Sequence, residues 1–455
     1  MLGPALRDRP PGLDEAFTLL DAVDDVLVHG LARLDEQRAA VLGALAAAVG
    51  ESPLADRVAH SVGKITAGTV TDEHLVTLAG ARTALLGAAH DALLTGVDAA
   101  LGRVREPWSA AAVPPPSVPL VSGSRSWLRE LAIAGWRGVD HDLAAGGAPA
   151  DRSLTADPAT RRLAVLLDGF GAELRAAAPV ATLDRVPVRR WADLWTRAVL
   201  LAQGTFPVHG AAPIDGRLLL LGVDLHEHPT VFRAQLHGLL ETPDGGVRLV
   251  RAGVAGAKVD TISGPSAWRM LAAFPVFRSA LAQRRSVEIS GMPLTPGGDL
   301  IWSESCAEVG EPADPFTTAR VRLGSASAFS ASPLDRHPTA IAEPVLLDGY
   351  VPAESAFDLG GGAVPLDLDR LPAAGPLTPA LVAASTACLG LLRFDGGRWA
   401  VQPLAVQAVV RRKSVAVHTG DWALGPTEAR AAKAEEVAGA AVDVLRERAG
   451  KLLRP

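Results

Sequence analysis

The run GRLLLLGVDLHEHPTVFRAQLHGLLE, residues 216–241, is the stretch on which the interpretation of the fold depends. Its first ten residues are largely apolar, which is typical of a buried strand. The polar run His226-Glu227-His228 interrupts this pattern and is expected at the connection between two strands. From Thr230 onward apolar and polar residues alternate, which predicts a second, half-exposed strand. The stretch therefore predicts a β-hairpin near the centre of the chain.

The sequence that follows extends this hairpin into a small β-domain. A tight turn at TPDGG and a strand over 247–254 come next. A helix is expected over 265–284, followed by strands over 286–290 and 298–303. Three strands, a helix and two strands is the element order of an OB-fold. We therefore expect a small β-barrel, OB-like in element order, within a β-rich domain at 206–305.

The N-terminal part of the chain carries a helical pattern. Apolar residues recur at intervals of three and four over 13–49, which predicts one long helix. This seam resembles a heptad stripe, which packs against another helix. Further helices are expected after Ser52 and Thr71, because serine and threonine suit the N-cap position. Residues 1–109 are therefore expected to form a helical bundle with a long hairpin.

Three further regions complete the expected organisation. The proline-rich stretch 110–124 is expected to be an extended linker, because proline cannot continue a helix. Residues 125–205 are expected to form a second helical region. Residues 306–455 are expected to contain mixed strands and a C-terminal amphipathic helix over 427–453. The predicted fold class is α+β and multidomain, with a helical bundle, a central small barrel and a C-terminal mixed α/β region.

The composition limits the partners and cofactors that can be expected. The formal net charge is -6 at pH 7, so no global positive field would attract nucleic acid or an anionic membrane. The chain has no asparagine, one tyrosine and few lysines beside abundant arginines, which indicates a GC-rich genome. The number of arginines is therefore poor evidence for phosphate binding. Two cysteines far apart in the chain form neither a disulfide framework nor a cysteine-rich zinc site.

The polar run at the hairpin connection is the most chemically suggestive motif. Alternate residues of an extended segment share a face, so Asp224, His226 and His228 are candidate ligands for a divalent metal. Glu227 between the histidines would then be a candidate acid or base. The helical HExxH spacing is absent, and His237 is expected too far along the second strand to complete the site. We favour a polar connection over a metal site.

Large apolar side chains on the helices are candidates for a protein-binding surface. Trp191 and Trp195 lie one helical turn apart, so they share a face. Leu27, Leu31 and Leu34 of the N-terminal seam offer a second surface. For the tryptophan face we favour internal packing of the helical part against the β-domain. Because tryptophan is enriched at interface hot spots, a partner site is the alternative. Both surfaces are therefore candidate contacts for a protein partner.

These observations favour a non-enzymatic adaptor or scaffold of a multi-protein system, since no complete catalytic constellation is visible. Its partners would be other proteins of that system or a second copy of the chain. The first alternative is a metal-dependent hydrolase centred on the polar run described above, with a divalent metal as its one cofactor. The weaker alternative is an OB-like binder of single-stranded nucleic acid, which the acidic charge and the few aromatic residues make unlikely. The residues that would contact the nucleic acid are Arg233, Arg248, Arg251 and Lys258.

The chain carries no sequence signal for a membrane or for export. Its N-terminus, MLGPALRDRPPG, lacks an apolar core of signal-peptide length. No uncharged stretch is long enough to span a bilayer. We therefore expect a soluble, cytoplasmic protein.

Overall fold

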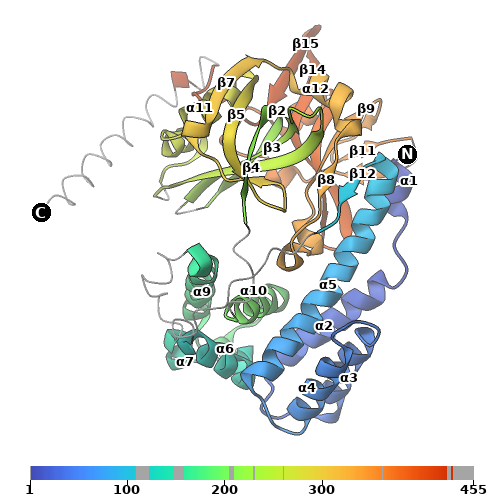
Figure 1. The fold of residues 1–455 in the computed structure, drawn as a ribbon, viewed down its shortest axis with the longest axis vertical. Coiled ribbons are helices and arrows are strands. Elements are labelled where there is room, and N and C mark those ends of the chain that lie inside the picture. Colours follow the sequence, from blue (N-terminus) through green and yellow to red (C-terminus); the bar gives the residue numbers. More distant parts are fainter. Residues whose placement is uncertain are drawn as a thin grey trace, which may run out of the picture.

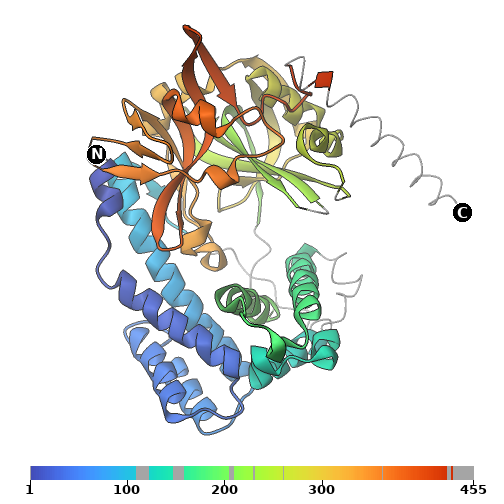
Figure 2. The same ribbon diagram turned by 180° about the vertical axis from the view of Figure 1, so that it is seen from behind.

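The computed structural model contains both helices and strands, which confirms the α+β class. The structure describes residues 2–108, 122–146, 158–203, 210–228, 231–259, 261–360, 362–427 and 432–433. Most helices gather in one half of the molecule and the strands in the other (Figure 1). Helix α5 (Asp72–Leu101) runs from the helical half to the β half, as the reverse view also shows (Figure 2). This arrangement brings residues of α5 close to the sheets.

The N-terminal region is helical, but residues 13–49 do not form one helix. They are divided into α2 (Leu13–His29) and α3 (Glu36–Ala48). The break lies at Gly30, which has a φ of 82° in the left-handed region. A Cβ atom at Gly30 would lie 2.4 Å from the carbonyl oxygen of Ile133, so a larger residue would prevent the close contact between these segments. The other helices of this region are α1 (Leu2–Arg7), α4 (Ala55–Thr66) and α5.

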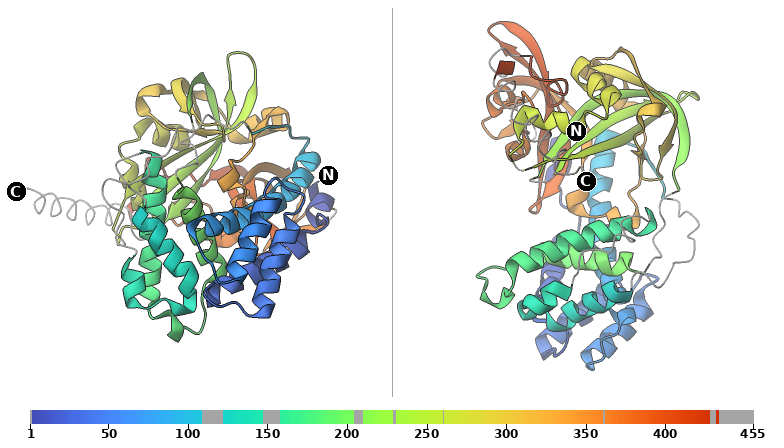
Figure 3. Two further views of the ribbon diagram at one scale, coloured as in Figure 1. Left: turned by 60° about the horizontal axis from the view of Figure 1, so that its bottom comes forward. Right: turned by 90° about the vertical axis from the view of Figure 1, so that its left-hand side faces the viewer.

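The second helical region packs into the same core as the first. Buried side chains from both regions, among them Leu42, Trp136 and Trp195, form one hydrophobic cluster. The helices of the two regions lie side by side (Figure 3, left). Most of the expected linker 110–124 lies outside the described residues, but Ser122 already begins a helix, so the last three residues of that stretch are helical. The helices of the second region are α6 (Ser122–Ala134), α7 (His141–Gly146), α9 (Pro158–Ala177) and α10 (Val188–Leu201).

The predicted central hairpin is confirmed. Strand β2 (Ala212–Glu227) pairs antiparallel with β3 (Val231–Glu241), and β3 pairs antiparallel with β4 (Val247–Ala257). Strand β4 then pairs in parallel with the short β6 (Asp299–Leu300). Strand β6 pairs with β5 (Arg285–Leu294), which also pairs with β2. The pairings therefore lead from β2 through four other strands and back to β2.

Alternate side chains of these strands share one core with the intervening helical segment. Phe232 on β3 is buried and meets Trp268 edge to face, with the ring centroids 5.4 Å apart. Trp268 belongs to the 3-10 helix η4 (Gly264–Leu271), which precedes α11 (Pro275–Gln283). Strand β7 (Ala307–Pro312) pairs with β5, so this sheet continues beyond the domain boundary expected at residue 305.

A second sheet lies beside the first, above the helical half (Figure 3, right). Leu389 and Ala405 of the second sheet belong to one buried cluster with Leu219 and Leu239 of β2 and β3. This contact covers part of the outer face of the first sheet. The strands of the second sheet, in spatial order, are β15 (Lys413–His418), β14 (Arg398–Val410), β13 (Ser385–Asp395) and β9 (Glu343–Asp348).

Short elements make up the rest of the described chain. The expected C-terminal helix over 427–453 lies almost entirely outside the described residues. The short strands are β1 (Arg105–Glu106), β8 (Ala328–Phe329), β10 (Val351–Pro352), β11 (Ala356–Asp358) and β12 (Ala363–Pro365). The short helices are α12 (Pro315–Arg322) and α13 (Pro379–Ala383). The remaining 3-10 turns are η2 (Trp136–Gly138), η3 (Val180–Thr182), η5 (Glu304–Cys306), η6 (Leu323–Ser325), η7 (Pro333–Asp335), η8 (Pro338–Ala340) and η9 (Leu368–Arg370).

Among the described helices, α5 is the one that is long and apolar enough to cross a membrane. In the structure, however, Leu75 and Leu78 of α5 belong to the core shared by the helices. Arg82 of α5 forms a buried ion pair with Asp24 of α2. Helix α5 is therefore a core helix of the bundle.

Candidate functional site

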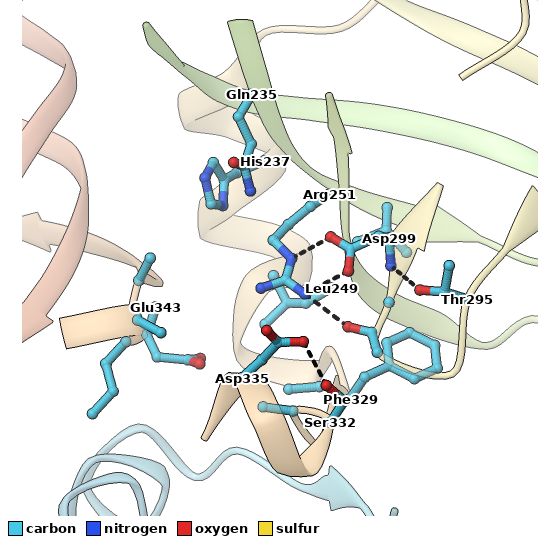
Figure 4. Close-up of a pocket in the computed structure, with 18 of the residues that line it drawn as sticks. Gln235, His237, Leu249, Arg251, Thr295, Asp299, Phe329, Ser332, Asp335 and Glu343 are labelled. Carbon is cyan, nitrogen blue, oxygen red and sulfur yellow. Dashed lines mark hydrogen bonds and ion pairs between the residues drawn. The ribbon is translucent and has the colours of Figure 1, made fainter. Parts of the chain in front are cut away.

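A pocket of about 630 Å³ lies where the β half meets the helices. Its floor is the outer face of β3 and β4, and one wall is the loop 295–298 between β5 and β6 (Figure 4). A second wall comes from the segment 331–344, together with Arg105 of β1 and Arg162 of α9. The volume falls within the range of small-molecule sites, roughly 300–1,000 Å³.

The alternation along β3 decides which side chains form the floor. Phe232 and Ala234 point inward and are buried in the core of the sheet. Arg233, Gln235 and His237 therefore point outward, and all three line the pocket. The polar side of the predicted strand thus becomes one surface of a cavity rather than a solvated face.

His237 is a polar side chain buried in this floor without a partner. It is 2% exposed, and its imidazole makes no hydrogen bond within the described part of the chain. Burial lowers the pKa of His237 to about 3. The positive charges of Arg251 and Arg393 also lower this pKa, whereas the negative charge of Asp224 raises it. The ring is therefore neutral near pH 7 and offers the pocket one donor and one acceptor nitrogen. Neither ring nitrogen is among the fully enclosed side-chain atoms without a partner in the described part of the chain, so the imidazole can bond to a ligand or to water in the pocket.

Four arginines line the pocket, and only one of them lacks a carboxylate partner among the described residues. That one is Arg233, which is exposed and donates a hydrogen bond to the side-chain oxygen of Gln235 at 3.1 Å. Its guanidinium is therefore available to an anion. The three paired arginines are Arg251 with Asp299 at 2.9 Å, Arg162 with Asp335 at 2.5 Å, and Arg105 with Asp98 at 2.7 Å and Glu343 at 3.2 Å.

The segment 331–344 is held in place by ion pairs to several helices. These pairs fix the wall of the pocket before any ligand arrives, which lowers the entropic cost of binding. The carboxylates of Asp335 and Glu343 lie on the pocket side of this segment (Figure 4). The other pairs are Arg336 with Asp91 at 3.2 Å, His337 with Asp193 at 3.3 Å, and Glu343 with Arg103 at 2.7 Å.

Asp224 and His226 lie beside this floor, on the neighbouring strand β2. Asp224 is buried and accepts hydrogen bonds from Arg393 at 2.6 Å and from Gln402 at 2.7 Å. The Nε2 atom of His226 lies 2.9 Å from Oδ2 of Asp224. Burial alone would raise the pKa of Asp224, but the hydrogen bond from His226 and the charge of Arg393 outweigh it and hold this pKa well below the usual range. Asp224 is therefore ionised, and both of its carboxylate oxygens accept hydrogen bonds from neighbouring side chains.

The candidate metal ligands named from the sequence do not come together as a metal site among the described residues. Among the residues that it describes, no three His, Cys, Asp or Glu side chains are grouped to hold a metal ion. Glu227 lies 3.5 Å from Nζ of Lys258, and His228 is exposed beyond the end of β2. The expectation that Asp224, His226 and His228 share a divalent metal is therefore not supported.

The tryptophans and leucines that are candidate contacts for a protein partner lie in the core of the helical bundle. Trp191 and Trp195 are 2% and 0% exposed, and both belong to the core shared by the helices. The indole of Trp195 donates a hydrogen bond to a backbone carbonyl of α6 at 2.9 Å. These side chains hold α10 in the bundle. The leucines of the seam lie in the same core, where Leu27 and Leu31 are buried and Leu34 is partly buried.

Sequence reasoning missed two of the side chains that matter most here. His237 was excluded as a metal ligand, yet its place on the polar side of β3 is the signal that puts it in the pocket. Glu343 comes from a distant segment, and no local pattern marks it as part of the site. No protein-family model matches the chain, and no curated protein resembles it in sequence.

Proposed function

We propose that the chain binds a small phosphate ester, of about nucleotide size, in the pocket on β3 and β4. The observation that carries this proposal is the buried, neutral and unpartnered imidazole of His237 in the pocket floor. A ligand hydroxyl or amide would satisfy this group, whereas an empty pocket leaves it to water. The volume of about 630 Å³ suits a ligand of this size.

The choice of a phosphate group follows from Arg233. A guanidinium without a carboxylate partner recognises phosphate or carboxylate through paired N–H donors. Gly253 of β4 lies beside Arg233, and a Cβ atom there would be 3.5 Å from its Nη2, which is ordinary van der Waals contact. The outward-facing side chains of β3 form a row in which Arg233 lies at one end. His237 lies two alternate positions further along this row, at a distance of ~13 Å. This distance suits an extended ligand with one anionic end.

The strand pairings support an OB-like arrangement, which we include in the proposal. The ring β2-β3-β4-β6-β5, with the parallel pair β4–β6 and the helical segment between β4 and β5, is the connectivity expected for that fold. Ligands of OB-folds bind on the second and third strands and on the loops beside them. The pocket occupies the corresponding surface, β3, β4 and the loop 295–298.

Isothermal titration calorimetry of the full chain tests the proposal. The probes are inorganic phosphate, adenosine 5′-monophosphate and a short oligothymidylate, which separate a free anion site, a nucleotide site and a nucleic-acid site. Arg233→Gln should weaken nucleotide binding by about 1.5–3 kcal/mol, or about 10- to 150-fold in Kd. Arg57→Gln, on the exposed surface of α4, is the matched control and should bind like the wild type. If none of the three probes binds, the proposal is rejected.

The adaptor function expected first from the sequence is not the one that this geometry favours. Partners such as other proteins of the same system or a second copy would need a surface other than the tryptophans and leucines named above, because these are buried. A soluble ligand-binding protein in the cytoplasm fits the proposal, and no part of it requires a membrane. Binding of single-stranded nucleic acid is kept as one outcome of the titration.

A further inference from the structure

We infer that Asp224 and His226 form an acid–base pair that hydrolyses the phosphate ester held by Arg233. The inference rests on the proposed function, because it uses the same ligand. It adds a chemical step that binding alone does not require. The juxtaposition that carries it is a histidine oriented by a buried carboxylate, directly opposite an arginine that has no carboxylate partner among the described residues.

Asp224 fixes the orientation of the imidazole ring of His226. Asp224 is an ionised carboxylate and can only accept hydrogen bonds, so the Nε2 atom of His226 at 2.9 Å must carry the proton. The Nδ1 atom of His226 is then an acceptor. No hydrogen bond to this atom occurs within the described part of the chain. A carboxylate that fixes the tautomer of a neutral histidine is the arrangement by which enzymes orient a general base.

Asp224 is itself held rigidly. Arg393 of β13 and Gln402 of β14 hold its two oxygens from the second sheet, at 2.6 and 2.7 Å. The side chain of Asp224 is 4% exposed, whereas that of His226 is 33% exposed. The anchor is therefore buried and the imidazole is accessible. Asp224 acts as a positioning residue, and His226 is the group that would touch the substrate.

The pairing of β2 with β3 sets the position of the substrate anion. In the β2–β3 pairing, His226 is directly opposite Arg233, so the two side chains leave the same face with Cβ atoms about 5 Å apart. A phosphate bound to Arg233 would thus lie beside Nδ1 of His226. Because Gln235 and His237 continue the same row into the pocket, the ester group would extend toward the pocket floor.

The step balances without any further reactant than water. Nδ1 of His226 takes a proton from a water molecule while the water oxygen forms a bond to phosphorus. The bond between phosphorus and the leaving oxygen breaks on the opposite side of phosphorus. The leaving oxygen takes its proton from solvent water, and the imidazolium releases its proton to solvent. Arg233 offsets the negative charge on the phosphoryl oxygens. The charged groups that face His226 are Asp224 on its own strand, Arg233 on β3 and Arg393 on β13.

The experiment measures release of p-nitrophenolate from bis(p-nitrophenyl) phosphate by the full chain, with EDTA present. His226→Ala should lower turnover at least about 100-fold, the lower end of what a general base contributes. It should leave the Kd for adenosine 5′-monophosphate within about threefold, and added imidazole should restore part of the turnover. Asp224→Asn should change the pH profile. His228→Ala, two residues away and exposed, is the matched control and should keep wild-type turnover.

The outcomes separate this inference from the proposed function. Binding of the nucleotide without turnover of the ester by the wild type would overturn the acid–base pair and leave the binding site intact. Turnover that His226→Ala retains, or that EDTA abolishes, would also overturn it. Loss of turnover in His226→Ala with unchanged nucleotide binding and rescue by imidazole is the supporting result. Circular dichroism of each variant confirms that it is folded.

Discussion

Replacing Arg82 by methionine tests the buried ion-pair cluster that joins helices α2, α5 and α10. Arg82 is 2% exposed and makes two hydrogen bonds to Asp24, at 2.6 and 2.9 Å, and an ion pair with Asp193 at 2.7 Å. The methionine removes the cation that the two carboxylates share. Among the described residues, the buried Asp24 then keeps only the ion pair with Arg189 at 3.2 Å, and Asp193 only that with His337 at 3.3 Å. Breaking a buried ion pair by removing one partner costs about 3–5 kcal/mol. For a helical half of this size, this corresponds to a fall in Tm of roughly 6–20 °C.

Tryptophan fluorescence follows this transition, because Trp127, Trp136, Trp191 and Trp195 lie in the core shared by the helices. The control is the triple variant Asp24→Asn, Arg82→Met, Asp193→Asn, in which both carboxylates are neutralised together with their shared cation. It should recover much of the loss, since neutral replacements of buried ion pairs are often tolerated. A single variant that loses less than about 1 kcal/mol would refute the reasoning, because exposed ion pairs give losses of that size.

The other predictions concern packing and pH. Trp195→Ala should lower the free energy of unfolding by about 3–5 kcal/mol in urea denaturation, with no partner needed to see the effect. Gly222→Ala should cost about 1–3 kcal/mol, because a Cβ atom there would lie 2.8 Å from Cβ of Leu404 in the second sheet; the urea midpoint reports it. His237 binds no proton when folded until about pH 3 but does so near pH 6.5 when unfolded, so stability falls as pH drops below 6.5. Between pH 7 and pH 5 the wild type should therefore lose about 2 kcal/mol more than His237→Gln.

The hairpin could be predicted because its information is local. Alternation over 230–241 shows which face of β3 is apolar, and the observed strand follows it. The same alternation places Arg233 and His237 together on the polar face. Whether that face meets solvent or a cavity depends on what covers it. The cover comes from the segment 331–344, about a hundred residues further along the chain and without a periodic pattern.

The errors in the helical half have a similar origin. The apolar spacing continues through Gly30, so periodicity alone extends one helix across 13–49. The break depends on the close approach of Ile133, which no local sequence feature shows. Trp191 and Trp195 share a face, but spacing cannot tell whether that face meets a neighbouring helix or a partner. The structure shows that it meets the bundle.

The Asp224 pair illustrates the limit most clearly. The sequence places Asp224 and His226 on one face, and the structure bears this out. Their chemistry, however, is decided by Arg393, which lies 169 residues away in the chain. From the local sequence, the carboxylate of Asp224 is a candidate metal ligand. In the folded chain, this carboxylate accepts a hydrogen bond from the guanidinium of Arg393 instead. Long-range pairing thus changes a candidate metal ligand into an anchor for a histidine.

The most direct test of the proposed function is a crystal structure of the full chain with adenosine 5′-monophosphate. We expect density for the nucleotide in the pocket on β3 and β4. Its phosphate should lie within hydrogen-bond distance of Arg233, and one of its polar atoms should contact the imidazole of His237. Nucleotide bound elsewhere, or a pocket that holds only water at saturating nucleotide, would contradict the proposed function.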